Sequence, residues 1–323
     1  MSVPISVIVP TFGRCASVER MLRAFSGQTV SAADFEVIVS IDGSHDGTED
    51  LVAGFSAPFA LRSLWQPNRG RAAACNAGFR AAAGELVVFL DDDMEPVPDF
   101  LAAHLRAHAE ATPHGVIGAA PIVIPDGAPP LAAFASRAFN ERLDRLARST
   151  SVQFNDAYTG NFSTPRAALE KVGGYDETFQ RYGHEDYELL LRLSQSGVQL
   201  VFAPDALAYQ HYEKNFAAVA RDAMARGHTA VHFARKHPEV VTRLRLGAFE
   251  RESRKWRLVR GVLLGLGRVF DGMPGAVVWL VTWLERLRPA RLDRYYTMAL
   301  DYFYWVGARA ALRERGERGV SCE

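Results

Sequence analysis

The 323-residue sequence has few cysteines and no paired cysteine spacing. Its three cysteines, Cys15, Cys75 and Cys322, are odd in number and lie far apart. Such a pattern excludes a disulfide framework and a structural zinc site of the cysteine-rich kind. We therefore expect a protein of a reducing compartment, the cytoplasm.

Long apolar runs and a secretory leader are also missing. The N-terminal segment MSVPISVIVPTF has no charged leader and no small-residue cleavage site. The longest apolar run, residues 274–284, is stopped by Asp271 and Glu285, well short of the roughly 20 residues that a spanning helix needs. The sequence predicts no signal peptide and no bilayer crossing, so we expect a cytoplasmic protein, free or peripheral on the inner face of the membrane.

Net charge is absent, but the charges are unevenly distributed. Over the whole chain, 37 basic residues balance 37 acidic ones. Residues 243–323 hold 16 Lys and Arg against 9 Asp and Glu, which leaves 21 against 28 for residues 1–242. A basic tail behind an acidic body indicates an anionic partner. The basic residues form no recognisable nucleic-acid motif, so we predict no nucleic-acid partner.

Strand-like and helix-like segments alternate over residues 5–100, which predicts βαβ units. The expected architecture is α/β, a Rossmann-like and mostly parallel sheet flanked by helices, with ligands beyond the carboxyl ends of its strands. Residues 216–323 show only helical patterns, a C-terminal helical extension with a soft boundary near 215. The predicted strands are 5–10, 35–42, 61–66, 86–90 and 198–204, with a proline-rich strand and loop at 120–130. The predicted helices of the first half are 16–28, 48–55 and 70–84.

Three adjacent carboxylates, Asp91-Asp92-Asp93, follow the strand at 86–90. Neighbouring carboxylates raise one another's pKa unless a cation lies between them. Mg²⁺ and Mn²⁺ prefer oxygen ligands and take one or two carboxylates together with phosphate oxygens and water. A metal bridging a diphosphate explains this triplet, and a solvated acidic turn that caps a helix explains it equally well in isolation.

Two other predicted strands also end in polar or aromatic residues. Phe12 follows the first strand, where it could cover a planar base or simply pack in the core, and Arg14 is close enough to reach a base or a phosphate. Asp42 opens the segment DGSHDGT, suited to close approach of a ligand or to a plain turn. Because the carboxyl ends of parallel strands meet at one edge, we expect these groups to converge there.

Four stretches in order now resemble one known family. They are ISVIVPTFGR, IDGSHDGT, NRGRAAACNAGFRAAAGELVVFLDDDMEP and GGYDETFQRYGHEDYELLLRL, and they are similar to successive motifs of the family 2 glycosyltransferases, nucleotide-sugar enzymes of the GT-A fold. The resemblance covers roughly residues 3–213. It implies a catalytic domain over 1–215, with a nucleotide-sugar-binding half at about 1–100 and an acceptor-binding half at about 101–215, before the helical region 216–323.

The resemblance also implies donor contacts. In PTFGR it assigns Pro10, Phe12 and Arg14 to the nucleobase region. It assigns Asp42 to the base, although the acidic residue that precedes this aspartate in the family is replaced by Ile41 in this chain. Arg71 is a candidate for the base or the diphosphate. The family often has an arginine where this chain has Cys75, so that contact is lost.

The family's DxD motif corresponds to Asp91 and Asp93. The resemblance implies Asp93 as a direct ligand of a divalent metal, Mn²⁺ or Mg²⁺, with Asp91 as a ligand or, like Asp92, near the ribose. His211 follows the last strand and is either a further metal ligand, as in some members of the family, or a structural histidine.

For the acceptor half, the resemblance implies a catalytic base. In YGHEDYELLLRL, Asp186 corresponds to the usual base and Glu185 to an acceptor or sugar contact, whereas helix capping explains the same pair without catalysis. Gly160 and Asn161 are candidate contacts for the donor sugar or acceptor, although both residue types also suit a turn.

Together these matches imply an inverting glycosyltransferase that works in cell-surface or other glycan and glycolipid assembly. The expected donor is a nucleoside diphosphate sugar, UDP favoured over GDP or dTDP, and the expected acceptor is a glycan or lipid-linked glycan. A nucleotidyltransferase would show a glycine-rich, lysine-bearing phosphate loop, which PTFGR is not. A catalytically silent sugar-nucleotide-binding protein would have lost its carboxylates, and only Ile41 and Cys75 favour that alternative.

The tail carries a basic amphipathic pattern. One predicted helical face holds Trp256, Val259, Leu263, Leu266 and Phe270, with Arg257, Gly261, Leu264 and Arg268 roughly opposite. The later segment YYTMALDYFYWVG adds aromatic residues suited to a membrane boundary. Peripheral membrane contact, packing on the catalytic domain and contact with a second subunit of a homo-oligomer all fit this pattern.

Overall fold

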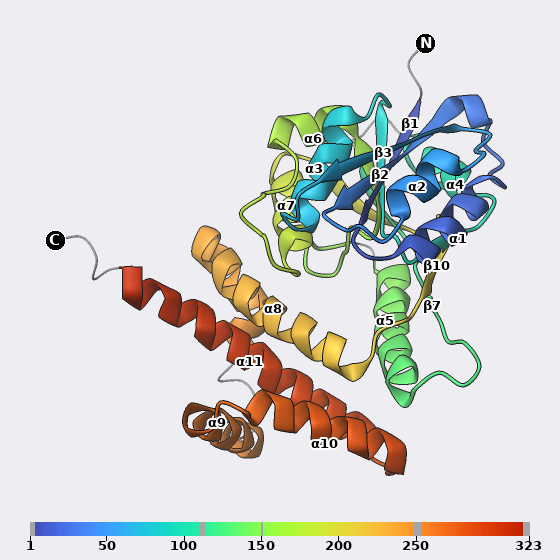
Figure 1. The fold of residues 1–323 in the computed structure, drawn as a ribbon. Helices are drawn as coiled ribbons and strands as arrows, with labels where there is room; N and C mark the ends of the chain where they lie inside the picture. The colour runs from blue at the N-terminus through green and yellow to red at the C-terminus, as the bar shows by residue number, and fades with distance from the viewer. Residues whose placement is uncertain (1–3, 110–113, 150, 249–253, 319–323) are drawn as a thin grey trace. The chain divides into compact units, whose positions relative to one another are not determined.

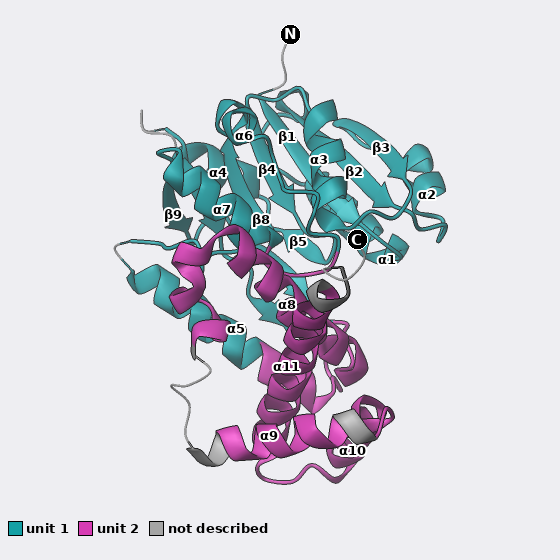
Figure 2. Ribbon diagram, turned by 90° about the vertical axis from the view of Figure 1, so that its left-hand side faces the viewer, with its two compact units in different colours: residues 1–124, 136–180, 185–212 teal, residues 125–135, 181–184, 213–323 magenta. Residues whose placement is uncertain are grey.

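Two compact units make up the chain. The computed structural model describes residues 4–109, 114–149, 151–248 and 254–318 (Figure 1). The first unit takes in residues 1–124, 136–180 and 185–212, and the second takes in 125–135, 181–184 and 213–323, as coloured in Figure 2. The last and longest segment of the second unit begins at residue 213. The two short segments of this unit carry no sequence signal that we recognised.

A seven-stranded sheet forms the centre of the first unit, in the order β3-β2-β1-β4-β8-β6-β9. All neighbours are parallel except β8, which runs antiparallel to β4 and β6. This confirms the predicted mostly parallel sheet, and every residue of β1, β2 and β4 is buried, as in a sheet covered on both faces. The strands are β1 (Ile5–Thr11), β2 (Phe35–Asp42), β3 (Ala60–Gln66), β4 (Leu86–Leu90), β6 (His114–Gly118), β8 (Asn161–Pro165) and β9 (Gln199–Ala203).

Helices cover the two faces of this sheet (Figure 1). Phe25 of α1 and Phe100 of α4 meet edge to face, with ring centroids 6.3 Å apart, and α3 and α6 meet where the Arg166 guanidinium lies 5.3 Å from the ring centroid of Phe79. The helices of this part are α1 (Cys15–Phe25), α2 (Thr48–Gly54), α3 (Arg71–Ala81), α4 (Phe100–Ala107), α5 (Pro130–Arg148), α6 (Arg166–Val172) and α7 (Glu185–Gln195), with a 3₁₀ turn at Ala32–Asp34. Residues 130–135 of α5 belong to the second unit.

A second sheet has three strands, and the first of them directly follows the triple aspartate in the sequence. Its order is β5-β10-β7, formed by β5 (Met94–Pro96), β10 (Ala208–His211) and β7 (Ile122–Val123). Of these three strands, only the one near β7 was predicted, within the proline-rich segment. The other two were missed, because strands of two to four residues are too short for a hydrophobic period to be visible. This sheet pairs Gln210 with Met94, and so brings the chain before His211 beside the residues after β4.

The second unit is helical. It contains α8 (Phe216–Lys236), α9 (Arg254–Val269), α10 (Met273–Leu287), α11 (Leu292–Arg318) and two 3₁₀ turns, Pro238–Arg243 and Arg245–Ala248. Gly227 and Gly307 allow α8 and α11 to cross closely, because a Cβ on Gly227 would collide with the backbone of Tyr304 and one on Gly307 with the backbone of Met224. Among the described residues, no helix is both long and apolar enough to cross a membrane.

The expected surface of the tail is only partly right. Leu266 and Phe270 are exposed, but Leu264, expected on the opposite face, packs against a buried cluster of α8 and α11. Most of the aromatic residues expected at a membrane boundary are buried instead, because α11 presents them to its neighbouring helices. These buried residues are Tyr296, Tyr302, Phe303, Tyr304 and Trp305. The side chains of Trp256 and Arg268 lie outside the part that the structure describes.

Candidate active site

The predicted donor residues of the first half lie at one edge of the large sheet. Strand β1 is central, with Thr11 paired to Ile41 of β2 and Ile8 paired to Phe89 of β4. The chain segments that leave β1, β2 and β4 therefore start side by side. Phe12 is 58% exposed at this edge, so its ring is not core packing and is accessible to a planar ligand.

The triple aspartate lies beside a cation from the neighbouring strand end. Arg14 Nε is 3.7 Å from Asp92 Oδ1, and Arg14 Nη1 is 3.9 Å from Asp93 Oδ2. Burial raises the pKa of Asp92 to about 7, and the neighbouring Asp93 adds to this, while the nearby Arg14 opposes it. Arg14 is thus a cation that Asp92 and Asp93 share.

Arg71 connects the two halves of the first unit. Its guanidinium donates to Asp91 Oδ1 from Nε at 3.1 Å and from Nη2 at 2.8 Å. It also donates to the hydroxyl of Thr159 at 3.1 Å and to Asp186 Oδ1 at 3.4 Å. Although burial opposes a charge here, the carboxylates keep the pKa of Arg71 well above its usual value. The predicted donor-side carboxylate and the predicted base thus share one cation.

The candidate base and its neighbour differ in exposure. Asp186 is a quarter exposed and accepts a hydrogen bond from the Thr159 backbone N–H at 3.3 Å. Glu185, the first residue of α7, is buried at 2% exposure. Asp186 is thus the more accessible of the two.

Gly160 lies against Asp91, where an added Cβ would come within 3.0 Å of Asp91 Cγ and still closer to Oδ2.

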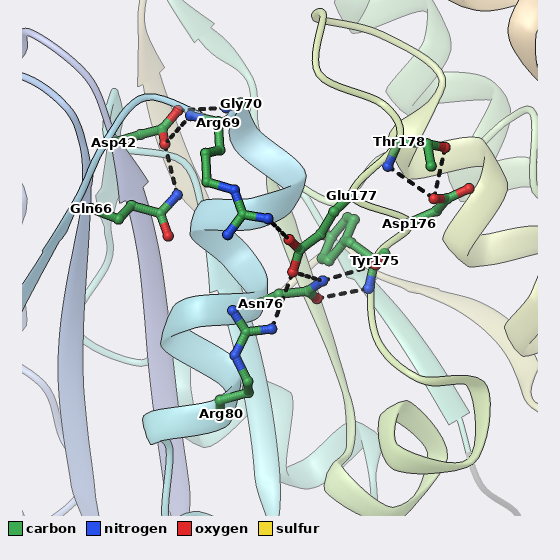
Figure 3. Close-up of polar contacts among 10 residues, drawn as sticks. All are labelled: Asp42, Gln66, Arg69, Gly70, Asn76, Arg80, Tyr175, Asp176, Glu177 and Thr178. Atoms are coloured by element: carbon green, nitrogen blue, oxygen red, sulfur yellow. Dashed lines mark hydrogen bonds and ion pairs between the residues drawn. The ribbon is translucent and has the colours of Figure 1, made fainter.

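Asp42 holds a loop (Figure 3). Its carboxylate accepts hydrogen bonds from Gln66 Nε2 at 2.7 Å and from the backbone N–H groups of Arg69 and Gly70 at 2.9 and 2.8 Å. These contacts fix the turn from β3 into α3, just before Arg71. Asp42 is 5% exposed. Its buried carboxylate therefore supports this loop at the predicted edge of the sheet.

Asn76 and Glu177 form a connection that the sequence reasoning missed. Asn76 Nδ2 donates to the Tyr175 carbonyl at 2.8 Å, and the Tyr175 N–H donates back to Asn76 Oδ1 at 2.8 Å (Figure 3). Glu177 accepts from Asn76, Arg69 and Arg80. The motif segments around 76 and 175 are thus bonded to each other, which neither segment shows by itself.

Two further predicted residues lie apart from Arg71. His211 Nε2 lies 2.6 Å from Glu95 Oε2, and the His211 backbone N–H donates to the Asp93 carbonyl at 2.9 Å. His211 is therefore next to the predicted metal ligand Asp93. Asn161 is fully buried, with its amide donating to the Ala119 and Ala206 carbonyls and its Oδ1 near His104, so the structure does not bring its side chain to the edge.

The donor atoms at the edge fit a hard divalent cation in kind. Aspartate oxygens are the ligands that Mg²⁺ and Mn²⁺ prefer. Within the described ranges, no three His, Cys, Asp or Glu side chains gather closely enough to hold a metal by themselves. Such an ion would take one or two carboxylates, from among Asp91 and Asp93, and complete its coordination with diphosphate oxygens and water.

The fold and this edge define a class: α/β proteins with acidic residues at the carboxyl end of a largely parallel sheet. The family model described as "Glycosyl transferase family 2" matches residues 6–173, more than half of the chain. The chain therefore belongs to glycosyl transferase family 2. A second model, described as "N-terminal domain of galactosyltransferase", matches residues 147–215.

Similar curated proteins carry glycosyltransferase names. One is validoxylamine A glucosyltransferase of Streptomyces hygroscopicus subsp. jinggangensis, 30% identical over 266 residues, which are 74% of this chain and 62% of that protein. Another is the pre-mycofactocin glycosyltransferase of Mycobacterium tuberculosis, 27% identical over 89% of this chain and 58% of that protein. The chain thus spans about three fifths of the length of these relatives.

Solved structures with the same GT-A fold include two with donor sugars. The mannosyltransferase PcManGT of Pyrobaculum calidifontis, in complex with GDP-Man and Mn²⁺, has a TM-score of 0.67 at 23% identity and covers 98% of this chain and 88% of its own. S. aureus TarS with UDP-GlcNAc has a TM-score of 0.55 at 16% identity, over 97% and 92%. At these identities the likeness establishes the fold, which confirms the GT-A prediction.

Proposed function

We propose that this protein transfers a glycosyl group from a nucleoside diphosphate sugar to a hydroxyl acceptor, with inversion, at the edge formed by β1, β2 and β4. The observation that carries the proposal is the shared cation: Arg71 contacts both Asp91 and Asp186. The family motifs around these carboxylates are about a hundred residues apart in sequence, and transfer requires donor and base within one small volume.

The donor would lie along the edge. Exposed Phe12 offers a ring for the base, Arg14 offers a cation for the base or phosphates, and Asp91 and Asp92 would contact the ribose. A divalent ion bound at Asp91 and Asp93 would neutralise charge on the departing diphosphate. UDP remains the favoured donor nucleotide of our proposal, while the two structural neighbours are bound to GDP-Man and UDP-GlcNAc.

Asp186 would act as the base. It accepts the proton of the acceptor hydroxyl as the new bond from that oxygen to the sugar C1 forms and the bond from C1 to the phosphate oxygen breaks. Arg71 and the Thr159 N–H hold the carboxylate in place.

The acceptor is a glycan or lipid-linked glycan in this proposal. A cytoplasmic location is consistent with Cys15 and Cys75, which are both free thiols.

The test has a binding arm and a turnover arm. UDP-, GDP- and dTDP-sugars are screened for thermal stabilisation with and without Mn²⁺, since a ligand that binds only the folded state raises its stability. Asp186→Asn should retain donor-induced stabilisation but lose turnover by roughly 10²-fold or more. Asp205→Asn, at an exposed aspartate of the same unit, is the matched control. Near-normal turnover of Asp186→Asn would exclude Asp186 as the base, and no stabilisation by any donor would refute the proposal.

A further inference from the structure

An apolar strip on α10 is exposed. Trp279, Trp283 and Leu287 are spaced by four residues and are 67%, 44% and 57% exposed, while Val281 on another side of the helix is buried. The two indole rings stack, with centroids 6.4 Å apart and planes inclined by 8°. We call these three residues the α10 strip. Side chains of this size are seldom left in water together without a partner.

The preceding helix has a similar strip. Leu258, Val262 and Leu266 of α9, again four residues apart, are 69%, 53% and 49% exposed. The same helix is fixed from its other side, where buried Arg260 Nε donates to Asp301 Oδ2 of α11 at 2.9 Å. The exposure of the α9 strip therefore belongs to a helix that is anchored in its unit.

The charges near these strips are basic. Residues 254–294 contain nine Lys and Arg against three Asp and Glu. Arg286, Arg288, Arg291 and Arg294 at the end of α10 and the start of α11 are all exposed. Of the three acids, Glu285 is already engaged by the Tyr296 hydroxyl at 2.8 Å.

We infer that α9 and α10 dock on the surface of an anionic lipid bilayer. Tryptophan is favoured at the boundary of headgroups and acyl chains, and exposed arginines beside it are attracted to anionic headgroups. With its 15 residues, α10 would lie in the interface rather than span it. A symmetric contact with a second copy would bring the same arginine-rich surface against itself, so that like charges face one another.

Vesicle flotation tests this inference independently of sugar transfer. The full chain is mixed with phosphatidylcholine vesicles or with vesicles that also contain phosphatidylglycerol. We expect flotation with the anionic vesicles, weakened at least 10-fold in Trp279→Ser/Trp283→Ser and in Arg286→Gln/Arg288→Gln. The control Leu312→Ser, at an exposed leucine of α11, should float like the unchanged protein. In the unchanged protein, tryptophan fluorescence should shift to the blue and be quenched by brominated lipid.

Three outcomes would overturn the inference. They are no association of the unchanged protein with anionic vesicles, equal flotation of the tryptophan variant, and a dimer by light scattering that dissociates in this variant. Because none of these readouts needs donor or acceptor, failure of the membrane inference is distinct from failure of the proposed reaction. A variant that unfolds leaves the fluorescence and quenching of the unchanged protein as the deciding measurement.

Discussion

Replacing Arg71 by lysine should damage stability and turnover together. The guanidinium is 16% exposed and reaches Asp91, Thr159 and Asp186 at the same time. A lysine retains the charge but, as a single point donor, cannot span these three groups. Breaking a buried ion pair costs about 3–5 kcal/mol. Because Asp91 and Asp186 are 35% and 25% exposed, water compensates in part, and we expect a loss of about 2–3 kcal/mol.

Urea unfolding tests the predicted loss of stability, and steady-state transfer kinetics test the predicted loss of turnover. The two carboxylates would lose their common anchor, and a displacement of the base by about 1 Å can cost on the order of 10²-fold in turnover. Arg80→Lys on the same helix is the matched control, since Arg80 is 59% exposed in its pair with Glu177 and such pairs contribute about 0.2–1 kcal/mol. If Arg71→Lys lost stability but kept normal turnover, Arg71 would not position the base. Unchanged stability as well would refute the bridge itself.

Three other changes probe the same unit. Gly160→Ala would place a Cβ against Asp91, so we expect a loss of about 1–3 kcal/mol with weaker donor-induced thermal stabilisation; unchanged values would show that Asp91 moves freely. Asn76→Ala removes both hydrogen bonds to the Tyr175 backbone and should cost about 2–4 kcal/mol in urea unfolding, whereas a loss below about 0.5 kcal/mol would contradict the connection. Burial lowers the pKa of His104 from 6.5 to about 3, so the unfolded chain binds this proton first. As the pH is lowered from about 6.5 to about 3, this group should reduce the free energy of unfolding by about 1.4 kcal/mol per pH unit. His104→Gln should show a correspondingly smaller slope in EDTA-containing buffer.

The sequence predicted the large sheet well because its strands carry a strong signal. Strands β1, β2 and β4 are continuous apolar runs that end in turn or polar residues, so their bounds were found to within a residue or so. The short strands β5, β7 and β10 have no such signal. The pairing of β1 with both β2 and β4 explains why Phe12, Asp42 and Asp91 start from one edge of the sheet.

Side-chain direction could not be predicted from the same patterns. Arg71 is predicted to contact the base or the diphosphate, and no sequence pattern indicated that its guanidinium also contacts both Asp91 and Asp186. Asn161 follows Gly160 in sequence, but alternation along β8 sends its side chain into the interior. The aromatic residues of α11 were misplaced for a similar reason: their composition suits a membrane boundary, and only helix packing decides which face is covered.

The position of Arg71 also bears on the arginine that this chain lacks. Cys75 stands where the family often has arginine, and Arg71 and Cys75 are four residues apart on α3, so both project from the same helical face. Cys75 is fully buried, and burial raises the pKa of its thiol to about 12, so it carries no charge there. A cation supplied one turn earlier by Arg71 already lies between Asp91 and Asp186. The bridge between Asp91 and Asp186 is therefore made without an arginine at position 75.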